Sequence, residues 1–315
     1  MQARLKVYRL DPQKGAEPYY QEYTAEVPSE ATVLDALLKI REEQDGSLSF
    51  RCSCRSAICG SCAMEINHHA QLACKTRLAV VAPKGEQVLV EPMANMTPLK
   101  DLVIDQDLFW SKVHAIRPWL EPVQPVPERE YSVPNEKMLE LTKTMSCIFC
   151  GCCVADCTVM TVDPTWLAPA ALAKAYRFTG DPRDAAARER LQLYTQPGGI
   201  WDCVHCFECV QQCPKNVAPM DWIMVQRRMA VEAGLTDSNG ARHAEAFVDS
   251  IKHAGWLNEV TLPIKSSGFS IPELLRLAPV GLRMVLKRKM PSPIHRPIPN
   301  VEEVRRLFNR LERKP

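Results

Sequence analysis

The sequence predicts an α+β protein in which a small sheet-containing domain precedes an all-helical domain. Three observations predict this order. Short runs in the first hundred or so residues alternate between apolar and polar side chains, which is typical of half-buried strands. From residue 136 onward, helical patterns dominate instead. Most of the 14 cysteines fall into three spaced runs, one in the first part and two in the second.

The N-terminal third predicts a compact sheet with one helix. Residues 3–10 roughly alternate and predict a strand, and residues 19–27 predict its hairpin partner. A capping-box-like start at Thr32 opens a helix. Ala63–Ile66 and Val88–Val90 predict strands that close the sheet. We therefore expect a β-grasp domain of the ferredoxin type over residues 1–100.

A loop in this domain has cysteines spaced as ligands of a [2Fe–2S] cluster. Cys54-x4-Cys59-x2-Cys62, with Cys74 further along, is the plant-type ferredoxin spacing. Small residues between them let backbone N–H groups approach the cluster sulfurs. Structural zinc is the alternative, but it is usually bound through paired C-x2-C knuckles, which the x4 spacing does not match. Cys52 has no place in the pattern and is expected to be a packed or bystander thiol.

Two later runs predict two cubane-type clusters. Each run has the spacing C-x2-C-x2-C-x3-C of bacterial ferredoxins, in which the first three cysteines hold one cluster and the fourth crosses to the other. The first predicted ligand set, for a [4Fe–4S] cluster, is Cys147, Cys150, Cys153 and Cys213. The second, for a third cluster, is Cys157, Cys203, Cys206 and Cys209. Cys152 is expected to be a bystander between two ligands.

Proline-rich sequence joins the two parts. Residues 101–135 predict a wrapping connector whose apolar residues pack between the domains. These residues are Leu102, Val103, Leu108, Phe109, Trp110, Ile116 and Trp119. An α-helical ferredoxin domain is expected over residues 136–234, and its first helix is expected to be capped by Asn135. Its further predicted helices are 169–178, 185–194 and 218–233. Residues 235–315 form a basic C-terminal extension.

Composition and motifs argue against several functions. The formal net charge of +2 gives no global attraction for nucleic acid, so no nucleic-acid partner is expected. The glycine motifs that bind dinucleotides and nucleotide phosphates are absent, as is any acid, base or nucleophile arrangement, so no catalytic or substrate-binding residue is expected. The sequence has no secretory signal and no apolar run of ~20 residues. A reducing compartment is expected, where clustered cysteines are usually metal ligands.

The cysteine runs and their neighbours resemble the iron–sulfur subunit of succinate dehydrogenase and fumarate reductase. The matching segments are Cys54–Cys62, Leu72–Cys74, Pro98–Asp105, Ser146–Cys153, Ala175–Phe178, Asp181–Asp184 and Cys209–Lys215, and the resemblance covers residues 1 to about 232. It implies an electron-transfer subunit, peripheral on the cytoplasmic side of the cell membrane. Such a subunit passes electrons one at a time between an FAD-containing flavoprotein subunit, which holds the succinate and fumarate site, and a quinone-linked, membrane-facing subunit.

Two other functions fit the same cysteine runs. One is the iron–sulfur subunit of a related flavin-dependent oxidoreductase, such as a thiol:fumarate or other polyferredoxin-like complex. The other is a non-redox, zinc-bound interaction protein. Thr158, Val162 and Val204 stand where the quinone-reactive members of the family carry Pro, Trp and His. The resemblance therefore implies no common-type quinone pocket, and it is nearer to divergent members whose membrane-facing subunit is cysteine-rich.

Cys206 departs from the common family pattern. The common pattern has an apolar residue there and a third cluster of the [3Fe–4S] type, whereas Cys206 completes the four-cysteine run. A fourth thiolate can hold the fourth iron, so a [4Fe–4S] third cluster is favoured over [3Fe–4S]. The alternative is that Cys206 is a buried small apolar residue.

The C-terminal extension is strongly basic. Residues 276–315 hold 11 Lys or Arg and three Glu, a formal charge of +8. Apolar residues between Leu274 and Leu286 form an amphipathic surface beside Lys287–Lys289. Such a surface suits an anionic membrane surface or an acidic partner. The alternative is an extended arm, favoured by four prolines, that wraps a sister subunit.

Overall fold

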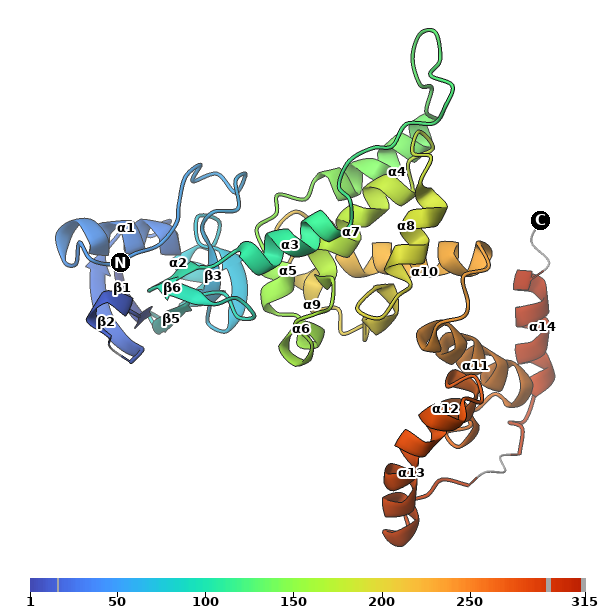
Figure 1. Cartoon of the computed structure of the whole chain (residues 1–315). Helices are drawn as coiled ribbons and strands as arrows, with labels where there is room; N and C mark the ends of the chain where they lie inside the picture. Colours follow the sequence, from blue (N-terminus) through green and yellow to red (C-terminus); the bar gives the residue numbers. More distant parts are fainter. Residues whose placement is uncertain (16, 293–295, 313–315) are drawn as a thin grey trace. The chain divides into compact units, whose positions relative to one another are not determined.

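The computed structural model describes residues 1–15, 17–292 and 296–312 (Figure 1). It divides into two compact units, Met1–Gln226 and a second unit that starts at Arg227. The first unit contains all 14 cysteines, and every one of them is a free thiol. The predicted α+β class, with the sheet first and the helices after it, is confirmed.

The N-terminal part of the first unit is a five-stranded mixed sheet. Its strands are β1 (Gln2–Arg9), β2 (Tyr19–Glu26), β3 (Ala63–Ile66), β4 (His69–Leu72) and β5 (Gln87–Glu91). They lie in the order β2-β1-β5-β3-β4. β1 pairs antiparallel with β2 and parallel with β5, while β3 pairs antiparallel with both β4 and β5. Alternate side chains of β1 are buried, as the sequence pattern predicts for a strand with one face on the core.

One helix, α1 (Val33–Glu43), contributes the other half of this core. The predicted capping box is present at its start. The Thr32 hydroxyl accepts the N–H of Asp35 at 3.3 Å, and the Asp35 carboxylate accepts the N–H of Thr32 at 2.8 Å. Six apolar side chains of α1 are buried, and they belong to the same cluster as those of β1 and β3. Two short helical segments, η1 (Pro12–Lys14) and α2 (Leu78–Val81), complete this part.

The connector contains more regular structure than predicted. It begins inside a short hairpin, in which β6 (Pro98–Lys100) precedes the connector and β7 (Val103–Ile104) belongs to it, and it continues with the helix α3 (Asp107–Ala115). The expected burial of its apolar residues is wrong for three of them, Leu108, Trp110 and Trp119, which are exposed. Leu102, Phe109 and Ile116 are buried as expected, and Val103 is half-buried. The helix explains part of the difference, because a surface helix turns only one side toward the core.

The rest of the first unit is helical. Its longer helices are α4 (Asn135–Met145), α7 (Ala168–Thr179), α8 (Ala187–Tyr194) and α10 (Pro219–Glu232), whose residues from Arg227 onward belong to the second unit. Its short segments are α5 (Cys152–Ala155), α6 (Thr158–Val162), η2 (Ile200–Asp202) and α9 (Glu208–Gln211). α7 is central, with ten buried residues and contacts to α3, α4, α5 and α8. The predicted cap at Asn135 is wrong. Pro134 occupies the capping position, and Asn135 is the first helical residue.

A buried ion pair fastens the connector to this helical part. The Asp184 carboxylate accepts hydrogen bonds from Nε of Arg190 at 3.1 Å and from Nη2 at 3.0 Å. Both side chains are fully buried. The same guanidinium donates to the carbonyl oxygens of Arg117 and Trp119, each at 2.6 Å. Because Arg117 and Trp119 belong to the connector, the pair ties its path to the turn before α8.

The second unit is also helical, so the expected extended arm is wrong for most of its described residues. It contains α11 (Asn239–Ala254), α12 (Thr261–Ser266), α13 (Ile271–Leu286) and α14 (Val301–Glu312). α11 contacts both α12 and α14, and Ile298 donates its N–H to the carbonyl oxygen of Ala254 at 2.9 Å. α13 differs from α11, because α11 buries Ala241 and Ala246 whereas none of the residues of α13 is buried. No helix in the described parts of the chain is long and apolar enough to span a membrane.

Replacing Asp184 by Ala should destabilise the first unit by roughly 3–5 kcal/mol, because the change leaves the Arg190 charge buried without its partner. The midpoint of urea denaturation, followed by circular dichroism on the cluster-loaded protein, measures this change. Glu189→Ala is the matched control. Its carboxylate pairs with Arg117 at 2.5 Å, but its side chain is 65% exposed, so the loss should be at most about 1 kcal/mol. Equal effects of the two changes would contradict the structural role given to the buried pair.

Candidate metal centres

The first cysteine loop wraps its backbone around its own sulfur atoms. Cys54 Sγ accepts the N–H groups of Ser56 at 3.4 Å and of Ile58 and Cys59 at 3.3 Å. Cys74, which follows β4, accepts the N–H of Ala57 at 3.3 Å. N–H groups aimed at sulfur stabilise negative charge there, as a thiolate-bound cluster requires. The loop therefore brings Cys74 to the cysteines that precede it by more than ten residues.

The thiols of this loop differ in their surroundings. The pKa of Cys59 is lowered to about 6, first by a hydrogen bond from the Ser61 side chain. The pKa of Cys62 is raised to about 12, first by burial and then by the neighbouring thiols of Cys74 and Cys59. Cys62, Cys59 and Cys74 are thus close enough to affect one another. Cys52 lies half-buried against the core of the sheet domain, as expected for a packed thiol.

Four cysteines from the two later runs line one cavity. They are Cys147, Cys150, Cys153 and Cys213. Cys213 belongs to the second run, so the structure brings the fourth cysteine of that run to the first three of the other. The cavity is also lined by Ala170 and Ala173 of α7, whose small side chains leave room between the helix and the thiols. A set of four thiols around an apolar cavity fits a cubane cluster by donor chemistry.

Two lysines add positive charge at this cavity. Lys174 of α7 acts electrostatically on Cys147, and its Nζ lies 5.1 Å from the centre of the Phe149 ring. Burial lowers the pKa of Lys174. Lys215 lines the cavity. The pKa of Cys150 is lowered, first by a hydrogen bond from the Cys152 side chain, and the charge of Lys215 adds to this lowering. Nearby cations offset the negative charge that four thiolates bring to a cluster. Sequence reasoning missed Lys174, because it lies on a helix outside every cysteine motif.

The remaining four cysteines of these runs are also brought together. The pKa of Cys209 is raised to about 12, first by burial and then by the nearby thiols of Cys203, Cys157 and Cys206. Burial also raises the pKa of Cys157, with added effects of Cys206 and Cys203. Cys157 and Cys209 are buried, Cys203 is half-buried and Cys206 is exposed. The alternative that Cys206 is a buried apolar residue is wrong, because Cys206 is exposed. The ligand interpretation stays a prediction.

The described residues contain no group of three or more His, Cys, Asp and Glu side chains arranged to hold a single metal ion. One ion requires all its ligands within about 2.3 Å of one point. In a cluster the cysteines bind different iron atoms, so the thiols lie further apart. The two kinds of site therefore differ in the spacing of their ligands.

The two cubane loops share a pattern of positive φ angles. In the first loop Phe149 and Gly151 have φ angles of 53° and 86°, and Cys150 lies between them. In the second loop His205 and Phe207 have φ angles of 58° and 66°, and Cys206 lies between them. A four-residue helical segment follows each pair, α5 in the first run and α9 in the second. Cys206 thus occupies the backbone position in its loop that Cys150 occupies in the other.

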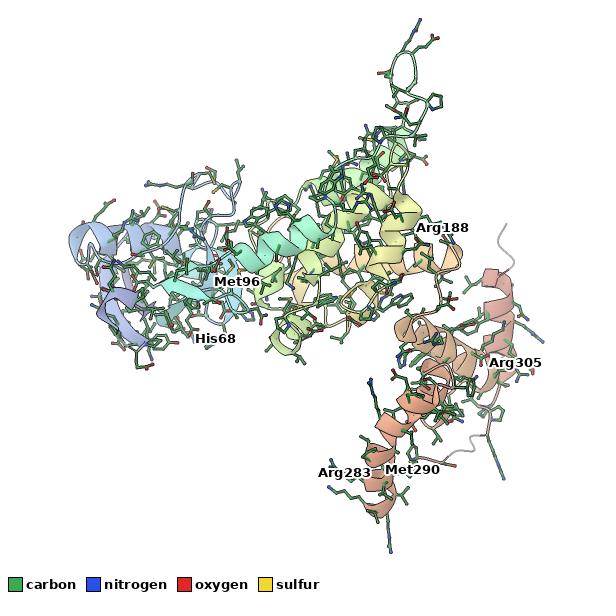
Figure 2. All side chains as sticks on the ribbon, in the orientation of Figure 1. His68, Met96, Arg188, Arg283, Met290 and Arg305 are labelled. Carbon is green, nitrogen blue, oxygen red and sulfur yellow. The ribbon has the colours of Figure 1, made fainter. Side chains whose placement is uncertain are left out.

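The turn α5 joins the helical part to the sheet domain. Cys152 is fully buried in the same apolar cluster as β1, β3 and α1, which explains why a cysteine outside the ligand spacing stands there. Asn95 Nδ2 donates to the carbonyl oxygens of Val154, Ala155 and Cys157 at 3.0, 2.7 and 3.1 Å. Figure 2 labels Met96, the residue next to Asn95, where the sheet domain meets the helices. The sequence alone gave no signal for the role of Asn95.

Two family models match the chain. Residues 4–111 match a 2Fe-2S iron-sulfur cluster binding domain, and residues 143–217 match a 4Fe-4S dicluster domain. The 8-methylmenaquinol:fumarate reductase iron-sulfur subunit of Wolinella succinogenes is 32% identical over 89% of this chain and 88% of its own length. The fumarate reductase iron-sulfur subunit of Mycobacterium tuberculosis is 39% identical over 68% of this chain and 87% of its own length.

The chain belongs to the family of iron–sulfur subunits of succinate dehydrogenases and fumarate reductases. A solved chain of the Mycobacterium smegmatis Sdh1 complex in the apo form superposes with a TM-score of 0.67, at 26% identity, over 73% of this chain and 96% of that chain. As a member of this family, the chain is a non-catalytic electron-transfer subunit of an oxidoreductase.

The family resemblance extends further than the sequence motifs suggest. The Wolinella subunit aligns with 89% of the chain, which is more than residues 1–232 can supply. Part of the C-terminal extension is therefore shared with that family member, and the expectation that the resemblance ends at about residue 232 is wrong.

Proposed function

We propose that the chain holds one [2Fe–2S] and two [4Fe–4S] clusters. The proposed ligands are Cys54, Cys59, Cys62 and Cys74 for the first cluster, Cys147, Cys150, Cys153 and Cys213 for the second, and Cys157, Cys203, Cys206 and Cys209 for the third. The lining of one cavity by the second set supports the crossing of the fourth cysteines between the runs. The observation that carries the proposal is the repeated backbone of the two cubane loops, which gives Cys206 the same position as Cys150.

The clusters, when bound, would supply one-electron redox chemistry to the subunit. The residues of the chain hold and tune these sites. Backbone N–H groups donate to Cys54 and Cys74, and Val217 donates to Cys213 at 3.3 Å. Lys174 and Lys215 favour the more negative, reduced state of the second site. Hydrogen bonds and net charge both set the potential of an iron–sulfur centre.

We infer two protein partners for the subunit. One is an FAD-containing flavoprotein subunit that interconverts succinate and fumarate, and the other is a membrane-facing, quinone-linked or cysteine-rich subunit. The names of the relatives support both, since they include an 8-methylmenaquinol:fumarate reductase subunit and a chain of the Sdh1 complex. Val162 and Val204 are 84% and 63% exposed, so their surfaces are open to a partner. The free cysteines fit the reducing, cytoplasmic face of the cell membrane.

The purified, cluster-loaded chain alone should not oxidise succinate with any dye as electron acceptor, because succinate oxidation depends on the flavoprotein. When the chain is combined with its co-purifying flavoprotein, succinate should reduce the clusters. This reduction appears as bleaching of the visible absorption. A thiol donor added in place of succinate is the control for the related thiol-dependent enzymes. Succinate oxidation by the chain alone, or bleaching by the thiol and not by succinate, would overturn the proposal.

Cys206→Val should convert the third site from four thiolate ligands to three. The expected result is a [3Fe–4S] signal in the EPR spectrum of the oxidised variant that the anaerobically prepared wild type lacks. Cys52→Ser, which removes a thiol outside the three sets, should leave the spectrum unchanged. If the wild type already shows this signal at full intensity and Cys206→Val matches it, Cys206 is not a ligand.

A third partner is suggested by α13, and we infer that it is an anionic membrane surface. Seven of its apolar residues fall within an arc of about 120° of the helix circumference. They are Ile271, Leu274, Leu275, Ala278, Leu282, Val285 and Leu286. Arg276 and Arg283 lie outside that arc, and Lys287–Lys289 follow the helix directly. Figure 2 shows Arg283 extending from this helix. Apolar residues on one side with adjacent cations are typical of helices that lie in the lipid headgroup region.

Leu275→Glu together with Leu282→Glu should abolish binding of the full-length chain to vesicles that contain anionic phosphatidylglycerol. The two changes place carboxylates in the middle of the apolar arc. Val280→Glu is the matched control, because Val280 is 55% exposed on the opposite side of the same helix, and it should keep most of the binding. Cosedimentation with anionic and with purely zwitterionic vesicles measures the effect. Unchanged vesicle binding with loss of complex assembly would assign α13 to a protein partner instead.

A further inference from the structure

Gly60 brings the backbone of the [2Fe–2S] loop against the first cubane loop. It follows Cys59 directly and has a φ angle of 74°, in the left-handed region that favours glycine. A Cβ atom at this position would lie 2.9 Å from both Cα and Cβ of Cys150, and 3.2 Å from the carbonyl oxygen of Ile148. Real Cβ atoms essentially never approach other atoms to 2.9 Å. The two loops are therefore in direct backbone contact at this point.

The contact at Gly60 differs from the surroundings of two comparable glycines. Gly85 has the same φ angle of 74°, but an added Cβ would meet no atom within 4 Å. Gly151 has a φ angle of 86°, and its nearest neighbours are the flexible side chains of Met96 and Met93. A methionine side chain can move to accommodate a new atom, whereas the backbone of Cys150 cannot do so without moving the whole loop. Gly60 is therefore under a steric constraint that its backbone conformation does not explain.

The surrounding structure holds this contact in place. Ile148 and Cys150 pack against the apolar core of the sheet domain, and α5, which begins two residues after Cys150, is buried in that core at Cys152. On the other side of the contact, the N–H of Ser61, the residue after Gly60, donates to Cys59 Sγ at 3.5 Å. Both loops are thus anchored on either side of the point where they touch, so neither can move away without disturbing a proposed ligand.

We propose that Gly60 is a positioning residue for electron transfer between the first two cluster sites. This inference rests on the ligand sets of the proposed function. The covalent path from Cys59 reaches Gly60 through one peptide bond, and it then meets Cys150 across a single van der Waals contact. Electron tunnelling weakens steeply with each added stretch of empty space, so a side chain that separates the loops slows the transfer.

The step moves one electron and no proton, and no bond forms or breaks. The cluster that Cys59 would help to hold would lose one electron, and the cluster that Cys150 would help to hold would gain it. The reduced flavin of the partner flavoprotein supplies the electron in the complex, and dithionite replaces it in the test below. Gly60 contributes neither charge nor a ligand to this step, only the absence of a side chain.

Gly60→Ala and Gly85→Ala form a matched pair for the test in the cluster-loaded, full-length complex. Both changes put alanine at the same φ angle, but only the first meets a neighbouring backbone. Iron content and the EPR signals of the separate clusters report whether each variant is loaded. We expect the Gly60→Ala [2Fe–2S] signal to lose much of the fast spin relaxation caused by the reduced neighbouring cluster, and electron equilibration to slow severalfold. Gly85→Ala should match the wild type in both measurements.

Two results would overturn the role of Gly60. One is a loaded Gly60→Ala variant with wild-type relaxation and equilibration. The other, which needs no variant to fold, is a wild-type [2Fe–2S] signal whose relaxation is the same whether the neighbouring cluster is oxidised or reduced. The ligand proposal fails differently, because a wild-type protein that lacks the [2Fe–2S] signal altogether would contradict the cysteine assignment itself.

Discussion

The arrangement of the first unit depends on the burial of one helical turn, α5. The turn places Cys152 in the core of the sheet domain, and Asn95 of that domain donates to three carbonyl oxygens at the end of the turn and just after it. The last carbonyl groups of any helix lack partners within the helix, so a side-chain amide that satisfies them stabilises both the end of the turn and its location. Because Cys150, Cys153 and Cys157 surround or belong to this turn, docking it on the sheet also orients these thiols. The contact between the two domains therefore also fixes the positions of these thiols.

The repeated left-handed residues of the two cubane loops show how the backbone aims the thiols. A bulky residue with a positive φ angle is a genuine outlier that costs free energy and is kept only where its surroundings enforce it. Phe149 is enforced by packing, with its ring 6.5 Å from that of Phe109 and 5.5 Å from that of Trp110. The connector helix α3, which carries both of these rings, therefore helps to hold the first loop in shape. Phe207, the other aromatic residue of this type, is 51% exposed, which leaves the second loop more open to solvent than the first.

Burial and charge oppose each other at these sites. Burial raises the pKa values of Cys147, Cys153, Cys157 and Cys209. The thiols of the metal-free protein therefore favour the neutral form, and iron must displace their protons on binding. Metal ligation offsets the free-energy cost of burying a thiolate, since a thiolate is stabilised by the metal that it binds. The N–H groups at Cys54 and the lysines near Cys147 and Cys150 act in the same direction, because each favours the negative form of a sulfur.

The sequence by itself determined the class of the fold and the grouping of the cysteines, because both are local properties. The alternation of β1 and the capping box of Thr32 depend on residues at most a few positions apart, and so does the C-x2-C spacing within each run. The tertiary structure alone decided which distant residues meet. Gly60 touches Cys150 across ninety positions, and Lys174 acts on Cys147 from a helix that lies outside the cysteine runs. Such contacts depend on how α5 and α7 pack against the sheet and the loops, and packing is set by the combined shapes of many side chains rather than by any one short pattern.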